Sequence, residues 1–205
     1  MHEKYTTRGL IVSASAYREA DKILSIFTED FGLVSAVAAG VRNSVSKLRY
    51  HTQDYAVRNF SLVRGRDLWR LVGAEEIPGV KGSAQGISQE GMAVYARVLS
   101  LIRRLVRGEE KNERVFLNLF SLYCLLSAIS AETARNKEEA VIFLSALETL
   151  TVFRILHSLG YIKSDAATEP LVATVEISAG LVAAAQPLVP SLISAINRGL
   201  TESHL

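Results

Sequence analysis

The 205-residue chain contains a single cysteine, Cys124, and four histidines that lie far apart. One cysteine cannot form an internal disulfide, and we expect Cys124 to be a buried thiol in a helix. The cysteine and histidines lack the spacing of a metal site, and the glycines match neither the Walker nor the dinucleotide-binding spacing. Because a nucleophile with its base and a cofactor motif are also missing, we predict a protein that is not an enzyme and holds no cofactor or metal.

The chain also has no apolar segment at its start that could act as a signal peptide. Its most apolar stretch, residues 140–159, is interrupted by Glu148, Arg154 and His157, which favours a buried helix over a membrane span. Hydrophobic residues make up 49% of the chain but aromatic residues only 7%, so the core is expected to be mainly aliphatic. These features predict a soluble cytoplasmic protein.

Residues 1–77 carry the signals of five short strands rich in β-branched and aromatic side chains. Turns containing Gly32 and Gly65 separate two pairs of them, because glycine accepts positive φ at little steric cost. Five strands in about 70 residues suit a small Greek-key barrel of the OB type, which often binds single-stranded nucleic acid. The expected strands are residues 10–14, 23–28, 33–38, 55–62 and 68–73.

Residues 78–205 are predicted to form a helical domain, so the expected class is α+β. A stretch rich in Gly, Ser and Gln, residues 81–89, forms the expected linker. Asn136, with Glu139 three positions later, resembles a capping box, and Gly160 is a suitable helix stop. Two strand-like pieces, 171–177 and 181–184, predict a small irregular or β insert at about 165–187. The expected helices are residues 90–107, 113–131, 136–160 and 191–200.

The charges of the predicted barrel are unevenly distributed. Residues 42–70 contain seven basic and two acidic residues, a net charge of +5, whereas residues 77–205 contain twelve of each. Four aromatic residues lie among these charges: Tyr50, Tyr55, Phe60 and Trp69. Cations that follow phosphates beside rings that stack on bases are typical of a strand-binding groove. A solvated sheet face with core aromatics is the alternative interpretation.

Four segments of the chain resemble the bacterial recombination mediator family RecO. They are the start of the chain (8–12 and 17–33), the third strand with its basic loop (37–42 and 46–49), a helix ending in Leu-Gly-Tyr (153–161), and the C-terminal stretch (195–205). The resemblance implies an OB barrel followed by a helical domain. It also implies binding of single- and double-stranded DNA, annealing of complementary strands, and loading of RecA on SSB-coated DNA together with RecR, in the nucleoid.

The chain departs from the family pattern at two points. Many members carry a four-cysteine zinc site in the C-terminal domain, which a chain with Cys124 alone cannot build. The family also often has lysine where this chain has Ala39, which removes one expected phosphate contact.

Within this framework we expect Arg42, Lys47 and Arg49 to contact phosphates from the loop after the third strand. The last hairpin would extend the positive track with Arg64, Arg66 and Arg70. Arg58 and Phe60, two positions apart on one strand, are a candidate charge and stacking pair, and Trp69 is either a second stacking ring or a core residue. The basic group Arg103, Arg104 and Arg107 either complements a helix dipole or binds the acidic SSB tail.

Two other functions remain open from the sequence. The first is an RNA-binding OB protein, which would prefer RNA through 2′-hydroxyl contacts. The second is a protein–protein adaptor, for which replacement of Arg42, Lys47 and Arg49 would leave function intact.

Overall fold

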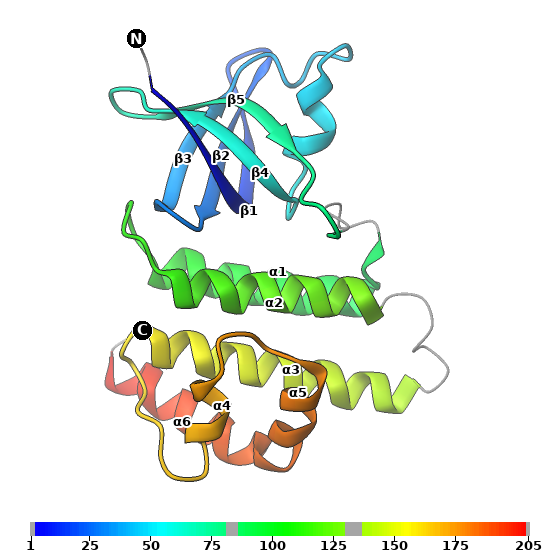
Figure 1. Ribbon diagram of the computed structural model, residues 1–205, viewed down its shortest axis with the longest axis vertical. Coiled ribbons are helices and arrows are strands. Elements are labelled where there is room, and N and C mark those ends of the chain that lie inside the picture. The colour runs from blue at the N-terminus through cyan, green and yellow to red at the C-terminus, as the bar shows by residue number, and fades with distance from the viewer. Residues whose placement is uncertain (1–2, 81–85, 130–136, 204–205) are drawn as a thin grey trace. The chain divides into compact units, whose positions relative to one another are not determined.

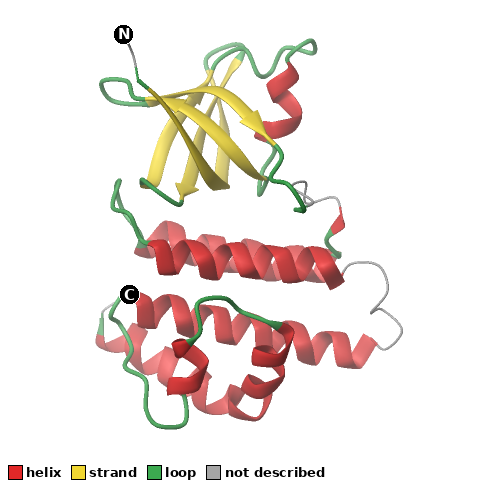
Figure 2. Cartoon of the chain, viewed as in Figure 1, coloured by secondary structure: helices red, strands yellow, loops and turns green. Residues whose placement is uncertain are grey.

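The computed structural model describes residues 3–80, 86–129 and 137–203. The chain divides into two compact units, residues 1–86 with 99–113 and residues 87–98 with 114–205. All five strands lie in the first unit, and most of the helical residues lie in the second (Figure 1 and Figure 2). The predicted α+β class, a five-stranded OB-type barrel followed by a helical domain, is confirmed. The domain boundary at residue 77 stays a prediction.

The five strands close into a barrel in the order β1-β2-β3-β5-β4. All neighbours are antiparallel except β3 and β5, which run parallel with Ala36 opposite Trp69. β1 is long enough to pair with both β2 and β4, and a bulge between Ile11 and Ser13 lets it bend from one partner to the other. The strands are β1 (Lys4–Tyr17), β2 (Asp21–Thr28), β3 (Gly32–Ala38), β4 (Val57–Val63) and β5 (Trp69–Glu75).

Side chains alternate in direction along each strand, and the inward-facing ones form the core of the barrel. Gly9 lies where a Cβ atom would come within 2.8 Å of Ile26 and 2.9 Å of Phe60, so its lack of a side chain makes room for both. The buried core residues include Ile11, Leu24, Ile26, Val34, Ala36, Phe60, Leu62, Trp69 and Leu71.

The second unit is organised around α3 (Lys137–Ser158), which contacts α4, α5 and α6. Leu147, Leu150 and Phe153 are fully buried, as expected for a central helix. Gly160 follows α3 at φ 81°, which confirms the predicted stop. The proposed cap at Asn136 and the end of the second helix at residue 131 lie outside the described residues. The other helices are α1 (Gln89–Leu105), α2 (Glu113–Ile129), α4 (Glu169–Ala173), α5 (Ala179–Ala185) and α6 (Val189–Glu202).

The predicted strand pieces at 171–177 and 181–184 are wrong. Residues 169–173 and 179–185 are the short helices α4 and α5. Pro170 stands in the first turn of α4, where its missing N–H costs nothing, and the Ser178 hydroxyl caps α5 by accepting from Leu181 N at 3.2 Å. β-branched residues therefore sit in helices here because tertiary contacts override their weak intrinsic preference.

Two further expectations concern apolar helices. Cys124 is half-buried rather than buried. Residues 138–158 and 179–202 are helical stretches long and apolar enough to cross a membrane by length and composition alone. The first is the core helix of the second unit, and half of its apolar window is buried inside the protein. This agrees with the buried helix expected at 140–159.

Candidate nucleic-acid interface

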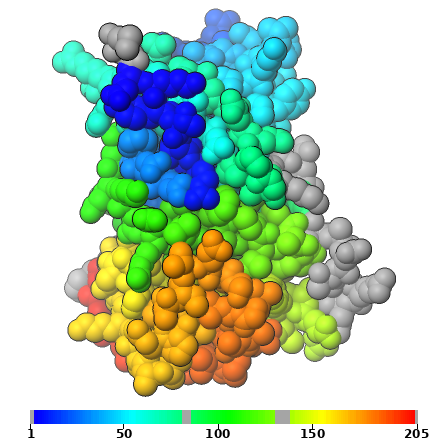
Figure 3. Space-filling model, viewed as in Figure 1, coloured from blue at the N-terminus to red at the C-terminus, as the bar shows by residue number. Residues whose placement is uncertain are grey.

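The loop between β3 and β4 presents basic side chains on a short 3-10 helix, η1 (Lys47–Thr52). Figure 2 shows this helix beside the barrel, and Figure 3 shows its segment at the surface. Its inner side is anchored, because Thr52 is fully buried and Leu48 packs against the barrel core. Lys22 Nζ also donates to the carbonyl oxygen of Thr52 at 3.2 Å. With one side held, Lys47 and Arg49 are left exposed to solvent.

Arg42 is exposed as predicted, but its guanidinium also has a structural contact. Its Nη1 donates to the carbonyl oxygens of Arg18 and Glu19, at 3.3 and 2.8 Å, and its backbone N–H donates to Ala20 O at 2.9 Å. These bonds join the loop after β3 to the turn between β1 and β2. Arg42 is therefore a latch between two loops as well as a surface cation.

Arg18 belongs to the same end of the loop pair and was missed by the sequence reasoning. It is exposed, has φ 52°, and its guanidinium carbon lies 5.1 Å from the centre of the Tyr17 ring. Its position in the β1–β2 turn could have identified it, because that turn borders the ligand face of OB barrels.

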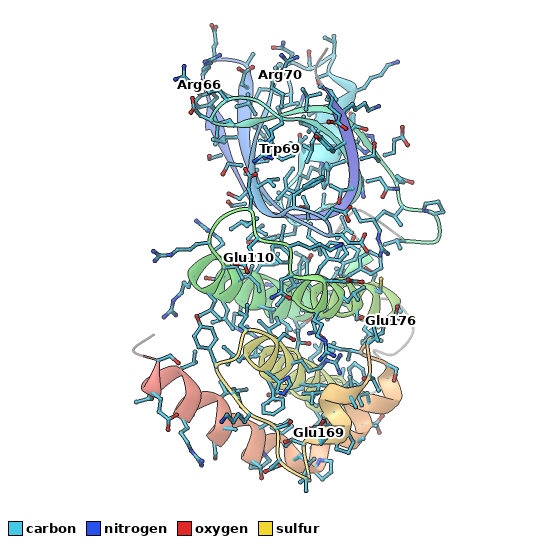
Figure 4. All side chains as sticks on the ribbon, turned by 60° about the vertical axis from the view of Figure 1, so that its left-hand side comes forward. Arg66, Trp69, Arg70, Glu110, Glu169 and Glu176 are labelled. Carbon is cyan, nitrogen blue, oxygen red and sulfur yellow. The ribbon has the colours of Figure 1, made fainter. Side chains whose placement is uncertain are left out.

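The hairpin between β4 and β5 carries the second basic group. Arg64, Arg66 and Arg70 are all exposed, and Figure 4 shows Arg66 and Arg70 on the barrel unit with Trp69. Among the described residues, Arg66 and Arg70 form no ion pair. β5 begins at this hairpin and contacts η1, so one strand connects the two basic groups.

Arg64 is held differently from its neighbours, by the segment that follows α1. Its Nη2 lies 3.2 Å from Glu109 Oε2, and its guanidinium carbon lies 5.5 Å from the centre of the Trp69 ring. Glu109 Oε1 accepts from Trp69 Nε1 at 2.8 Å. Glu109 therefore engages a cation and a ring of the hairpin at once.

The same segment also covers the turn between β2 and β3. Gly108 O accepts from Leu33 N at 3.2 Å, and Lys111 Nζ lies 3.6 Å from Asp30. Gly32 has φ 66°, and a Cβ atom there would come within 2.2 Å of Glu110 O, so this close approach requires glycine. Residues 108–111, together with Arg64 and Trp69, are called the clasp below.

The predicted pair of Arg58 and Phe60 is wrong. Phe60 is fully buried in the barrel core and cannot stack on a base without leaving it. Arg58 is 3% exposed, with Nε donating to His51 Nδ1 at 3.1 Å and Nη1 to Val57 O at 2.8 Å. Both side chains are buried, Phe60 in the barrel core and Arg58 against His51 of η1, so neither is available to a base or a phosphate.

Trp69 is a core residue, the second of the two interpretations left open. It is 2% exposed and packs near Tyr5 and Phe31, with ring centres 5.7 and 5.1 Å away. Tyr50, which lies among the basic residues in the sequence, is 71% exposed. It is the only exposed aromatic side chain in the part of the chain that the structure describes.

The basic group Arg103, Arg104 and Arg107 lies at the C-terminal end of α1 and just beyond it. All three side chains are exposed, and within the described ranges none forms an ion pair. Cations in the last turn complement the helix dipole, so this position is explained without a partner. Their partner-binding role stays a prediction.

The residues present do not fit the zinc site that the resemblance implies for many members. Across residues 3–80, 86–129 and 137–203, no three His, Cys, Asp or Glu side chains gather where they could hold a metal ion. A site of four thiolates also needs four cysteines, and this chain has one.

The closed five-stranded barrel places the first unit in the class of OB-type domains. Residues 1–78 match the family described as "Recombination protein O N terminal". This N-terminal domain is therefore similar to the N-terminal domain of the RecO family.

Several relatives called "DNA repair protein RecO" are similar to the chain. The protein of Acaryochloris marina is 32% identical over 124 residues, which are 60% of this chain and 40% of the relative. That of Rubrobacter xylanophilus is 31% identical over 126 residues, 55% of this chain and 51% of the relative. That of Synechocystis is 34% identical over 95 residues, 46% and 35%. The matches thus span about half the length of these relatives or less.

Proposed function

We propose that this chain is a non-enzymatic DNA-binding protein of recombinational repair. It binds single- and double-stranded DNA without sequence specificity, through the exposed cations of η1 and the β4–β5 hairpin. The observation that carries the proposal is that Lys47, Arg49, Arg66 and Arg70 are exposed without an ion pair in the described structure. Residues 42–53 contain no acidic side chain, so no carboxylate of this stretch repels a phosphate. The relatives to which this chain is similar are called DNA repair proteins, which supports the same role.

Annealing of complementary strands needs no catalytic group in this proposal. Cations that neutralise the phosphates of two strands hold them at a high local concentration, and base pairing completes the reaction. The resemblance to the RecO family extends the proposal. In this proposal the chain acts with RecR to load RecA on SSB-coated DNA, in the cytoplasm and at the nucleoid.

The salt dependence of single-strand binding tests the DNA interface. Four free cations on a single strand predict a slope of log affinity against log salt of about −3. Affinity for a labelled 30-mer should therefore fall about 50-fold between roughly 50 and 200 mM salt, measured by fluorescence anisotropy. The double variant Lys47→Ala/Arg49→Ala should halve the slope to about −1.4. It is preferable to a variant that includes Arg42, since loss of that residue would also open the latch to the β1–β2 turn.

The variant Lys163→Ala/Arg198→Ala is the matched control, because it removes two exposed cations of the second unit. It should leave the slope unchanged. An absence of binding by the native chain at about 50 mM salt would reject the DNA interface and favour a protein–protein adaptor. A clear preference for RNA of the same sequence would favour the RNA-binding alternative.

Arg103, Arg104 and Arg107 are our proposed contact for the acidic C-terminal tail of SSB. Three exposed cations attract an acidic peptide by charge complementarity. A labelled tail peptide should bind the native chain and lose affinity on the variant Arg103→Ala/Arg104→Ala, which should still bind DNA. Equal peptide affinity for both chains would exclude these residues from that contact.

A further inference from the structure

The single exposed aromatic ring of the barrel unit stands beside its free cations. Tyr50 is 71% exposed, and no hydrogen bond or ring contact within the described structure involves its side chain. An exposed aromatic ring among cations is the combination by which proteins bind single strands, because the ring stacks on a base while the cations follow the phosphates. Val45, earlier in the same loop, is 89% exposed and adds apolar surface.

The 3-10 geometry of η1 sets how Tyr50 faces its neighbours. With three residues per turn, side chains three positions apart lie one above the other. Lys47 and Tyr50 are so spaced and are both exposed, whereas Leu48 packs against the barrel core and Thr52 is fully buried. Arg49 lies next to the ring in the sequence and is also exposed. A phosphate-binding ammonium and a ring that can receive a base therefore share one face of a helix that is anchored from behind.

We infer that Tyr50 is a base-stacking residue and that the η1 loop selects unpaired DNA. The inference rests on the proposed DNA binding and adds to it a preference for single-stranded over double-stranded DNA. A tyrosine ring can stack only on a base whose face is accessible, and bases in a duplex are already stacked on their neighbours. Lys47 and Arg49, in contrast, contact phosphates that both forms of DNA present.

The test compares Tyr50→Leu with Tyr50→Phe on a 30-nucleotide single strand and on the corresponding duplex. Leucine keeps an apolar side chain without a ring, and phenylalanine keeps the ring without the hydroxyl. Tyr50→Leu should weaken single-strand binding about 5- to 150-fold, the range for loss of one stacked base. Duplex binding and the salt slope should not change, because the substitution removes no charge. Tyr50→Phe should bind like the native chain.

A strand of the same length with abasic sites throughout is the control on the ligand side. It keeps the phosphates but offers no ring, so the native chain and Tyr50→Leu should bind it equally. The exposed substitution Val175→Ala, in the second unit, controls for nonspecific effects of surface changes. Circular dichroism and thermal unfolding should show that all variants are folded, since both positions are exposed.

Equal weakening of single-strand, duplex and abasic binding by Tyr50→Leu would overturn the inference, and so would no weakening at all. In both cases the native chain still binds DNA and the proposed function stands. If the native chain binds neither DNA form, the proposed function fails and the stacking role fails with it. Whether the native chain binds DNA therefore distinguishes failure of the stacking role from failure of the proposed function.

Discussion

Arg154, in the middle of α3, is the residue whose replacement best tests what stabilises the second unit. Its side chain is buried, yet no carboxylate is among its partners in the described structure. Nε donates to Asn118 Oδ1 at 2.6 Å, and Nη2 donates to the carbonyl oxygens of Thr174 and Val175 at 2.7 and 3.0 Å. Nη1 donates to the carbonyl oxygen of Leu171 and to Thr174 Oγ1. One guanidinium thus joins α2, α3 and the chain from α4 onward.

The free energy of unfolding should fall by about 2–4 kcal/mol in the variant Arg154→Met. Methionine has an unbranched side chain that occupies similar space but has no hydrogen-bond donor, so the main loss is that of the hydrogen bonds. Asn118 and Leu171 are buried, and each oxygen left without a donor costs about 1–3 kcal/mol. Thr174 and Val175 are exposed, so their carbonyl groups can bind water instead. Part of this loss is offset, because Arg154→Met no longer buries a cation. The unfavourable setting of that cation is seen in the pKa of Arg154, which is lowered by desolvation and secondly by the charge of Arg114.

Urea unfolding measures this loss as a lower midpoint at an unchanged slope. Hydrogen exchange should quicken at residues 171–175, where the bonds are removed. Arg154→Lys should behave like Arg154→Met, because an ammonium cannot place five donors in one plane. Lys163→Met, at an exposed cation of the same unit, is the control and should be neutral. A change smaller than about 0.5 kcal/mol for Arg154→Met would refute the reasoning and show that the desolvation cost of the cation cancels its bonds.

Two further predictions concern carboxylates. Glu109→Gln should release Arg64 from its ion pair with residue 109, so that the salt slope for single-stranded DNA becomes about 0.7 more negative. The fluorescence of Trp69, the only tryptophan, should change in the same variant because its Nε1 partner loses charge, and an unchanged slope in the anisotropy titration would contradict the idea. Asp165 accepts hydrogen bonds from the hydroxyl and the backbone N–H of Thr168, which lower the pKa of its carboxyl group. Its stabilising effect should therefore be present at pH 7 and fade as pH falls through this lowered pKa. Thermal unfolding should show Asp165→Asn less stable than the native chain at pH 7, with the difference shrinking as pH falls below the ordinary pKa of an aspartate, and a constant difference would count against the carboxylate.

The strands were readable from the sequence because β-branched and aromatic residues gather between turn residues such as Gly32 and Gly65. Ile11, Leu24 and Val34, from three of these strands, are all buried in the barrel core. The central helix was readable because apolar residues occupy nearly all its faces, which only a buried position explains. The insert near 171–184 was misread because its β-branched residues favour strands locally. The contacts of Arg154 and the cap at Ser178 hold it instead around two short helices.

The sequence predicted the basic residues of the candidate interface but not which aromatic ring is exposed there. Phe60 and Tyr50 both lie among basic residues in the sequence, and local pattern does not separate them. Closure of the barrel turns Phe60 into the core, and anchoring of η1 by Leu48 and Thr52 turns Tyr50 outward. In the same way, only the folded chain brings Glu109 to Arg64, 45 positions earlier.

The amino-acid sequence by itself determined the barrel, the central helix and the basic excess of residues 42–70, because periodicity and net charge are local properties of a chain. The tertiary structure decided which cations are free, which ring is exposed and which charge is buried. Those properties depend on contacts between residues far apart in the sequence, such as Glu109 with Trp69 and Arg154 with Asn118. Burial and pairing arise only when the chain closes on itself.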